Sequence, residues 1–218
     1  MKTSVIGFPR VGKLRELKFA TEKYFRNEVT VQQLEETAEE IRKYQWNLQK
    51  ESNIDYIPSN DFSFYDLVLD TAVLFNIVPK EYKELNLSDI DTYFAMARGY
   101  QGENGDVKAL AMKKWFNTNY HYIVPEIEDD TKIKLVGTNP FKYYSEAKKD
   151  GIETKPVIVG PFTLLKLARF TGNKSVDDFV DDTIKAYSEL LNEINKLGVN
   201  WIQFDEPFLV HDITKEDL

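Results

Sequence analysis

Gly7-Phe8-Pro9-Arg10-Val11-Gly12-Lys13-Leu14-Arg15-Glu16-Leu17-Lys18 follows directly on a short run, residues 4–6, that is mainly apolar. Gly7, Pro9 and Gly12 are typical turn residues, and the charged segment after them is rich in good helix formers. This order predicts a strand, a tight turn and the start of a helix, which is the repeating unit of α/β barrels and sheets. In such folds the functional residues gather where the strands end.

The same turn concentrates positive charge in a chain that is acidic overall: Arg10, Lys13, Arg15 and Lys18. Arg15 and Lys18 are three positions apart, so they share one face of a helix. Two cations near a helix N-terminus favour a carboxylate or phosphate ligand. The alternative interpretation is that they are ordinary solvated side chains of a first helical turn.

Composition narrows the class of protein. The 218 residues are 42% hydrophobic, and the formal net charge is −8. This length supports a sizeable core in about one or two domains, and the negative charge argues against nucleic acid or an anionic membrane as partner. With no cysteine and two histidines, we expect no zinc site within the chain. No apolar segment is long enough for a signal peptide or a membrane span, so we expect a cytoplasmic protein.

Hydrophobic patterning predicts strands that alternate with helices, and hence parallel βαβ units. The chain has about five segments of strand character by this criterion, at 4–8, 54–57, 120–124, 156–160 and 199–204. The expected helices lie at 14–25, 30–48, 63–75, 91–98, 106–116, 139–151, 162–170 and 175–197. Pro58 is expected to end the second strand, and the polar segments 80–90 and 126–134 are expected to be loops.

Polar residues follow two of these strands. Asp61 and Ser63 lie at a strand-to-helix junction, where they either cap the next helix, Ser63 together with Asp66, or contribute to a site. Asp205 and Glu206 end the last strand, where carboxylates orient a ligand, act as a base, hold a metal or cap the next element. These alternatives stay open at the level of the residues.

Five segments, taken together and in order, resemble the N-terminal barrel of the cobalamin-independent methionine synthase family. The resemblance spans essentially the whole chain, with only 80–110 and 126–150 lacking distinctive motifs. The matching segments are Gly-Phe-Pro-Arg-Val-Gly with Arg-Glu-Leu-Lys at 7–18, Asp-Phe-Ser-Phe-Tyr-Asp at 61–66, Lys-Trp-Phe-Asn-Thr-Asn-Tyr-His-Tyr at 114–122, Lys-Pro-Val-Ile-Val-Gly-Pro at 155–161 and Trp-Ile-Gln-Phe-Asp-Glu-Pro at 201–207.

The resemblance implies a fold and an activity. The fold is a pair of (β/α)8 TIM-type barrels, of which this chain, residues 1–218, is an incomplete N-terminal portion with extra helices. The activity is methyl transfer from 5-methyltetrahydrofolate polyglutamate to homocysteine, giving methionine, with zinc and without cobalamin. The zinc ligands, the homocysteine pocket and the catalytic residues belong to the C-terminal barrel, which this chain lacks, so the chain alone is expected to be inactive.

The resemblance also implies a binding site for 5-methyltetrahydropteroyltri-L-glutamate. Carried over residue by residue, the folate-binding positions are Arg15, Glu16, Leu17, Lys18 and Lys114. Asn119 and His121 are second-tier candidates outside this set. The carry-over agrees with the reading of the residues themselves, because cations suit the carboxylates of a glutamate tail.

The chain is shorter than a complete barrel, which typically takes about 250 residues. It is therefore expected to be a fragment of a longer enzyme, with open sheet edges that favour self-association. One alternative is a stand-alone folate-binding or scaffold domain without chemistry. Another is a different reaction on a related barrel, with Asp205 and Glu206 as the working carboxylates.

Overall fold

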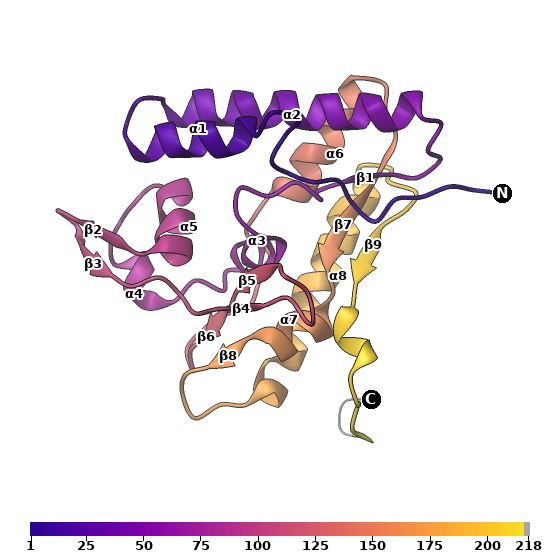
Figure 1. Cartoon of the computed structure of the whole chain (residues 1–218). Helices are drawn as coiled ribbons and strands as arrows, with labels where there is room; N and C mark the ends of the chain where they lie inside the picture. The colour runs from indigo at the N-terminus through magenta and orange to yellow at the C-terminus, as the bar shows by residue number, and fades with distance from the viewer. Residues whose placement is uncertain (216–218) are drawn as a thin grey trace. The chain divides into compact units, whose positions relative to one another are not determined.

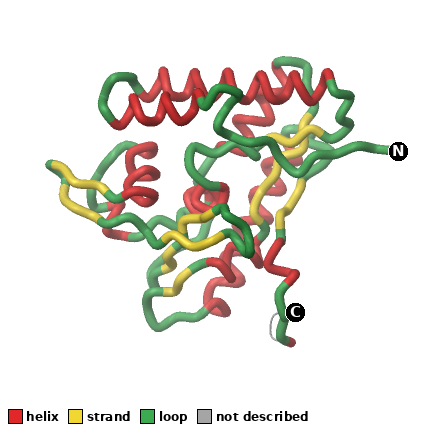
Figure 2. Tube along the Cα trace, in the orientation of Figure 1, coloured by secondary structure: helices red, strands yellow, loops and turns green. Residues whose placement is uncertain are grey.

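A computed structural model describes residues 1–215, which divide into two units. Unit 1 comprises Met1–Phe64, Asn139–Val157 and Leu197–Gln203, and unit 2 comprises Tyr65–Thr138, Ile158–Lys196 and the residues from Phe204 onward. The chain contains both helices and short strands, which alternate regularly only from residue 139 onward (Figure 1), and loops connect most of them (Figure 2). The fold is therefore mixed α/β, as expected.

Unit 1 contains three helices and the beginning of a sheet. Its elements are α1 (Glu16–Phe25), α2 (Val31–Glu51), β1 (Ile57–Ser59), α6 (Asn139–Lys149) and the first part of β7 (Thr154–Val159). β1 pairs in parallel with β7, and Ser4 forms an isolated parallel bridge with Tyr56, the residue just before β1. In Figure 1, α1 and α2 lie side by side.

The long helix α2 forms for reasons that are visible in the sequence. Thr30 and Gln33 make the expected capping box, in which each side chain bonds the backbone N–H of the other. The buried face of α2 includes Ala38 and Ile41, which pack with Leu17 of α1 and with Phe62. The apolar stripe thus joins α1, α2 and the segment after β1 in one core cluster.

Unit 2 contains the remaining elements. They are α3 (Leu67–Leu74), α4 (Lys80–Lys83), α5 (Asp89–Arg98), β2 (Tyr100–Gly102), β3 (Gly105–Val107), β4 (Met112–Lys114), β5 (His121–Ile123), β6 (Glu126–Ile127), α7 (Pro161–Leu167), β8 (Arg169–Phe170), η1 (Val176–Phe179), α8 (Val180–Lys196), β9 (Gln203–Asp205, which begins in unit 1) and η2 (Pro207–Val210). The rings of Phe75 and Tyr187 stack at 4.3 Å in the interior of this unit.

The strands form small sheets. The three-stranded sheet has the order β1-β7-β9, and β6 pairs in parallel with β8. The hairpins β2–β3 and β4–β5 are antiparallel. Within residues 1–215 the strands do not close into a barrel, so the structure supports a mixed α/β domain, which is coarser than the expected barrel.

Several predicted elements are wrong or shifted. The strand expected at 4–8 is only the bridge at Ser4, and the strand expected at 54–57 is β1, which includes Pro58 instead of ending at it. Pro58 has no N–H to donate, and its carbonyl accepts a hydrogen bond from the Trp46 indole. The segments 80–90 and 126–134, expected to be loops, contain α4, the start of α5 and β6.

The helix expected at 106–116 is also wrong, because this segment provides β3 and β4. β3 pairs with β2 and β4 pairs with β5, so cross-strand pairing outweighs the local preference for helix. The N-cap of α3 is Asp66, whose Oδ1 accepts the N–H groups of Val68 and Leu69, so the helix begins later than the expected start at Ser63. The helix expected at 162–170 ends at Leu167, and β8 follows it.

Candidate functional site

Residues 8–10 of the loop between Ser4 and α1 are fixed to the rest of unit 1 by three hydrogen bonds, and Nε2 of Gln203 adds a longer one, at 3.4 Å, to the carbonyl of Ile6. Oδ2 of Asp61 accepts the N–H of Phe8 at 2.7 Å, and Nε2 of Gln45 donates to the carbonyl of Pro9 at 2.7 Å. Nη1 of Arg10 donates to the carbonyl of Phe64 at 3.0 Å. The loop is therefore held by α2 and by the segment after β1, and Arg10 is used to hold it.

The turn into α1 depends on two residues in the left-handed region. Gly12 has φ +81°, and a Cβ at this position would collide with the carboxylate of Glu16. Arg15, the N-cap of α1, has φ 66° and no side-chain cap. A left-handed arginine is uncommon, and its conformation is sustained by the surrounding bonds, including Leu17 N–H to Val11 O at 3.2 Å. This turn delays the helix start from the expected residue 14 to Glu16.

The expected binding residues of unit 1 fall into two kinds. Arg15 and Lys18 are exposed, and Lys18 has one loose ion pair, with the equally exposed Glu22 at 3.6 Å. Leu17 is buried in the core, and Oε2 of Glu16 accepts the N–H of Leu14 at 2.9 Å. Two cations are thus presented to solvent at the start of α1, while their two neighbours hold the turn that carries them.

Lys114, the fifth expected residue, belongs to unit 2. It is exposed at the end of β4 and lies opposite His121 of β5. The hairpin is attached to α3 because Oδ2 of Asp66 accepts the N–H of Ile123 at 3.0 Å. Asp66 therefore serves two elements at once, one oxygen for the helix start and the other for the hairpin of Lys114.

Asp61 has the most strongly perturbed carboxyl group of this loop region. Burial raises its pKa from the ordinary 3.8 to about 6. The hydrogen bond from Phe8 and the positive charge of Lys155 act in the opposite direction and only partly offset the desolvation. Asp61 does not cap α3, so the capping alternative for this residue is wrong.

The carboxylate after β9 serves the start of a helix. Glu206 accepts the N–H groups of Phe162 at 3.0 Å and Thr163 at 2.7 Å, which are the first free amides of α7. Of the alternatives for the Asp205–Glu206 pair, the structure thus favours capping for Glu206. Within residues 1–215 no group of three or more His, Cys, Asp or Glu side chains is placed to hold a metal ion.

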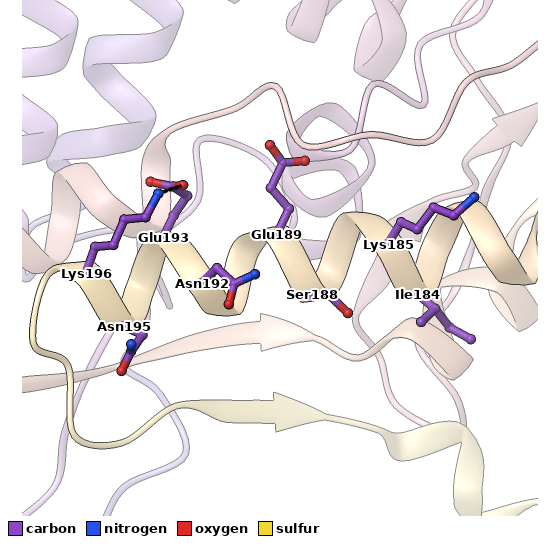
Figure 3. Close-up of a pocket in the computed structure, with 8 residues that line it drawn as sticks. All are labelled: Ile184, Lys185, Ser188, Glu189, Asn192, Glu193, Asn195 and Lys196. Carbon is purple, nitrogen blue, oxygen red and sulfur yellow. Dashed lines mark hydrogen bonds and ion pairs between the residues drawn. The ribbon is translucent and has the colours of Figure 1, made fainter.

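A surface depression of about 560 Å³ runs along α8 (Figure 3). All the residues that line it come from this one helix: Ile184, Lys185, Ser188, Glu189, Asn192, Glu193, Asn195 and Lys196. Side chains of a single helix surface do not converge on a ligand, so this depression is not the candidate site. No helix among the described residues is long and apolar enough to cross a membrane.

Gln45 is the functional neighbour that the sequence analysis missed. It is buried on the apolar face of α2, where a polar side chain needs a hydrogen-bond partner. A glutamine in the middle of an apolar stripe indicates that its side chain has a hydrogen-bond partner. The sequence does not show that this partner is the carbonyl of Pro9.

The fold and the loop define an α/β domain with a cationic turn after its first parallel segment. The comparison with known proteins then gives the family: residues 2–218 match the family described as "Cobalamin-independent synthase, N-terminal domain", and the chain belongs to it. The predicted resemblance is thereby confirmed.

Curated relatives agree with this assignment. The chain is 56% identical over 217 residues to a protein of Streptococcus suis and 55% identical over 217 residues to one of Streptococcus thermophilus. It is 56% identical over 218 residues to one of Campylobacter jejuni subsp. doylei. Each is named 5-methyltetrahydropteroyltriglutamate–homocysteine methyltransferase. All of this chain is covered, and it spans 29% of the length of each relative.

Proposed function

We propose that this chain is the folate-tail-binding portion of a cobalamin-independent methionine synthase, an enzyme that transfers a methyl group from 5-methyltetrahydropteroyltri-L-glutamate to homocysteine. The observation that carries the proposal is the pair of exposed cations, Arg15 and Lys18, on a turn fixed by three hydrogen bonds. Supporting it are the family membership and the names of the relatives.

The binding residues in this proposal are Arg15, Glu16, Leu17, Lys18 and Lys114. The guanidinium and ammonium groups of Arg15 and Lys18 meet carboxylates of the tail. Leu17 is buried, so its part is to anchor α1 and offer its backbone, and Glu16 stabilises the turn through Leu14. Lys114 adds a further cation from the β4–β5 hairpin.

The proposed architecture is the N-terminal part of a (β/α)8 barrel, with a catalytic barrel outside this chain. The parallel pairs β1–β7 and β6–β8 support it. The longer protein would use zinc to activate homocysteine, and the described residues do not fit such a metal. The contribution of this chain to the reaction is therefore binding: contacts to a remote tail supply energy that positions the reacting methyl group.

The proposed setting is the cytoplasm, without nucleic acid or membrane as partner. The isolated chain is proposed to self-associate, because the edges of a sheet that is not closed leave backbone groups unpaired. Sedimentation velocity at several concentrations tests this: association should increase with concentration. A monomer at every concentration would contradict it.

The function is tested by titrating the intact protein with the triglutamate and the monoglutamate forms of 5-methyltetrahydrofolate. The variant Arg15→Ala/Lys18→Ala should weaken triglutamate binding by about tenfold or more, since each lost ion contact is worth roughly 1 kcal/mol. The matched control is Lys23→Ala/Arg26→Ala, which removes two charges near the other end of α1 and should leave binding within twofold. Equal losses in both variants would mean that only general charge matters.

Lys114 has its own matched control in Lys113. The two residues are adjacent on β4, so their side chains point to opposite faces of the hairpin. We expect Lys114→Ala to weaken triglutamate binding by about threefold and Lys113→Ala to have no effect, the smaller loss reflecting one exposed contact. If Lys113→Ala weakens binding as much, Lys114 has no specific role.

A further inference from the structure

Asp61 is a half-buried acidic group that the proposed tail contacts do not use. It follows β1, and its carboxylate receives the N–H of Phe8 at 2.7 Å in the loop that leads to Arg15. The other two bonds that hold this loop come from Gln45 and Arg10. Of the three side chains that make these bonds, Asp61 is the one whose charge changes near neutral pH, because its pKa is about 6.

The loop has few other contacts that could replace this tie. Between Phe8 and α1 the backbone bonds are local ones, such as Arg15 N–H to Gly12 O at 3.4 Å and Leu17 N–H to Val11 O at 3.2 Å. These bonds shape the turn but do not attach it to the sheet. Asp61 is therefore the side chain that joins the loop to the residues directly after β1, while Arg10 joins it to Phe64 and Gln45 joins it to α2.

Three elements bring charged or polar side chains near Asp61: β7, the loop before α1, and α2. From β7, Lys155 is the charged group that acts on the carboxylate. From the loop, Arg10 is engaged with the carbonyl of Phe64, and from α2 the neighbouring tie is the neutral Gln45. Arg42 of α2 is paired with Glu146 of α6 at 2.8 Å.

We propose that Asp61 is a positioning residue for the folate-tail site: its ionised carboxylate holds the N–H of Phe8 and so fixes the loop that leads into α1, at whose start Arg15 and Lys18 lie. The inference rests on the proposed function. A charge-assisted hydrogen bond is stronger than a neutral one, so loss of the charge loosens the loop, although it relieves the desolvation of the carboxylate and does not destabilise the rest of unit 1. The tail site then loses the pre-organised spacing of its two cations.

A pH dependence follows from the raised pKa of about 6. As pH falls through this value the carboxylate is protonated, and binding of the tail should weaken. The carboxylates of the glutamate tail titrate near about 4.3, below this range, so their charge does not account for such a change. Histidine, the other residue that titrates here, is absent from unit 1 and present in unit 2 as His121 and His211.

A purely electrostatic role of Asp61 predicts the opposite change in affinity for the glutamate tail. If Asp61 acts on the ligand only by through-space repulsion of an anionic tail, removing its charge strengthens binding. The sign of the change therefore separates positioning from repulsion.

The test compares Asp61→Asn with the matched control Asp55→Asn in the intact protein. Asp55 lies before β1 and accepts the N–H of Thr3 at 2.7 Å, so it makes the same kind of bond at the other end of the segment. We expect Asp61→Asn to weaken triglutamate binding about fivefold at about pH 7.5, with the ratio of triglutamate to monoglutamate affinity falling by a similar factor. Asp55→Asn should change neither.

Wild-type affinity should also fall between about pH 7.5 and about pH 5, and this fall should disappear in Asp61→Asn. Asp61→Ala, which has no acceptor at all, should bind the triglutamate no better than Asp61→Asn. Unchanged or stronger triglutamate binding by Asp61→Asn, or a pH dependence that survives in it, would overturn the positioning role while leaving the tail site intact. Absence of tail-dependent binding by the wild type would overturn the proposed function, and the inference with it.

Discussion

The loop before α1 and the junction before α7 are built alike but leave different groups free. In each, a carboxylate that follows a strand accepts a backbone N–H: Asp61 bonds Phe8, and Glu206 bonds Phe162 and Thr163. Glu206 is placed on the first amides of its helix. Asp61 bonds Phe8, several residues before α1 begins. The N-cap of α1, Arg15, has no side-chain cap.

This difference in hydrogen-bond partners indicates which strand end is available as a binding site. At α7 the negative carboxylate already satisfies the helix amides, and the N-terminal charge of the helix dipole is compensated. At α1 the carboxylate is used on the loop, and the exposed cations Arg15 and Lys18 stay at the helix start. A carboxylate at a strand end thus indicates structure or function according to which N–H group it accepts.

The largest expected effect is at Glu206. Glu206→Ala leaves the two amides without their charged acceptor, which should lower the free energy of unfolding by roughly 3 kcal/mol. Denaturant unfolding measures it, and hydrogen exchange at Phe162 and Thr163 should rise with it. Glu206→Gln keeps one acceptor oxygen and should lose less. If Glu206→Ala is as stable as the wild type, the capping role is wrong.

Asp61 should behave in the opposite way toward stability. Its folded pKa of about 6 lies above the ordinary 3.8, so the folded state binds this proton more tightly. The stabilisation is complete at low pH and is lost as pH rises through about 6. At about pH 8 the ionised group is unfavourable by up to about 3 kcal/mol, and Asp61→Asn should recover part of this, about 2 kcal/mol.

This stability prediction is checked by denaturant unfolding of the wild type and Asp61→Asn from about pH 5 to about pH 8. The difference between the two proteins isolates Asp61 from other carboxylates. A variant that is less stable than the wild type at the upper end of this range would show that the ionised carboxylate is not a burden to the fold. The contrast with Glu206, where removal destabilises, would then disappear.

The smallest effect is at the turn itself. Gly12→Ala should lower the free energy of unfolding by about 1 to 2 kcal/mol, because φ is +81° and the new Cβ meets the carboxylate of Glu16. Gly151→Ala is the matched control, since Gly151 has φ +69° and open space around its Cβ position. Thermal unfolding should rank Gly12→Ala below Gly151→Ala. Equal values would mean that backbone strain alone accounts for the loss.

Much of the helical structure could be predicted because its causes are local. The capping box at Thr30 and Gln33 and the apolar spacing of α2 were both readable, and α8 ends just before Gly198 as its pattern indicated. The segment 106–116 could not be predicted in this way. Its strands exist through pairing with Tyr100–Gly102 and His121–Ile123, and pairing partners are not encoded in the periodicity of one segment.

The candidate site shows the same division. The sequence predicted the cations Arg15, Lys18 and Lys114, and motif similarity indicated the family that the comparison confirmed. It left Asp61 and Glu206 undecided between capping and function. Only the folded chain shows that Asp61 bonds Phe8 and that Glu206 bonds α7.

The sequence by itself determined the family, the α/β class, the cationic turn and the ends of the strongest helices, because motifs, charges and caps lie within a few residues of one another. The tertiary structure decided the left-handed Arg15, the half-buried Asp61 with its raised pKa, and the role of Glu206. These depend on groups brought together from distant positions. The role of a carboxylate depends on the hydrogen-bond donors around it and on its desolvation, and both are established only when the chain folds.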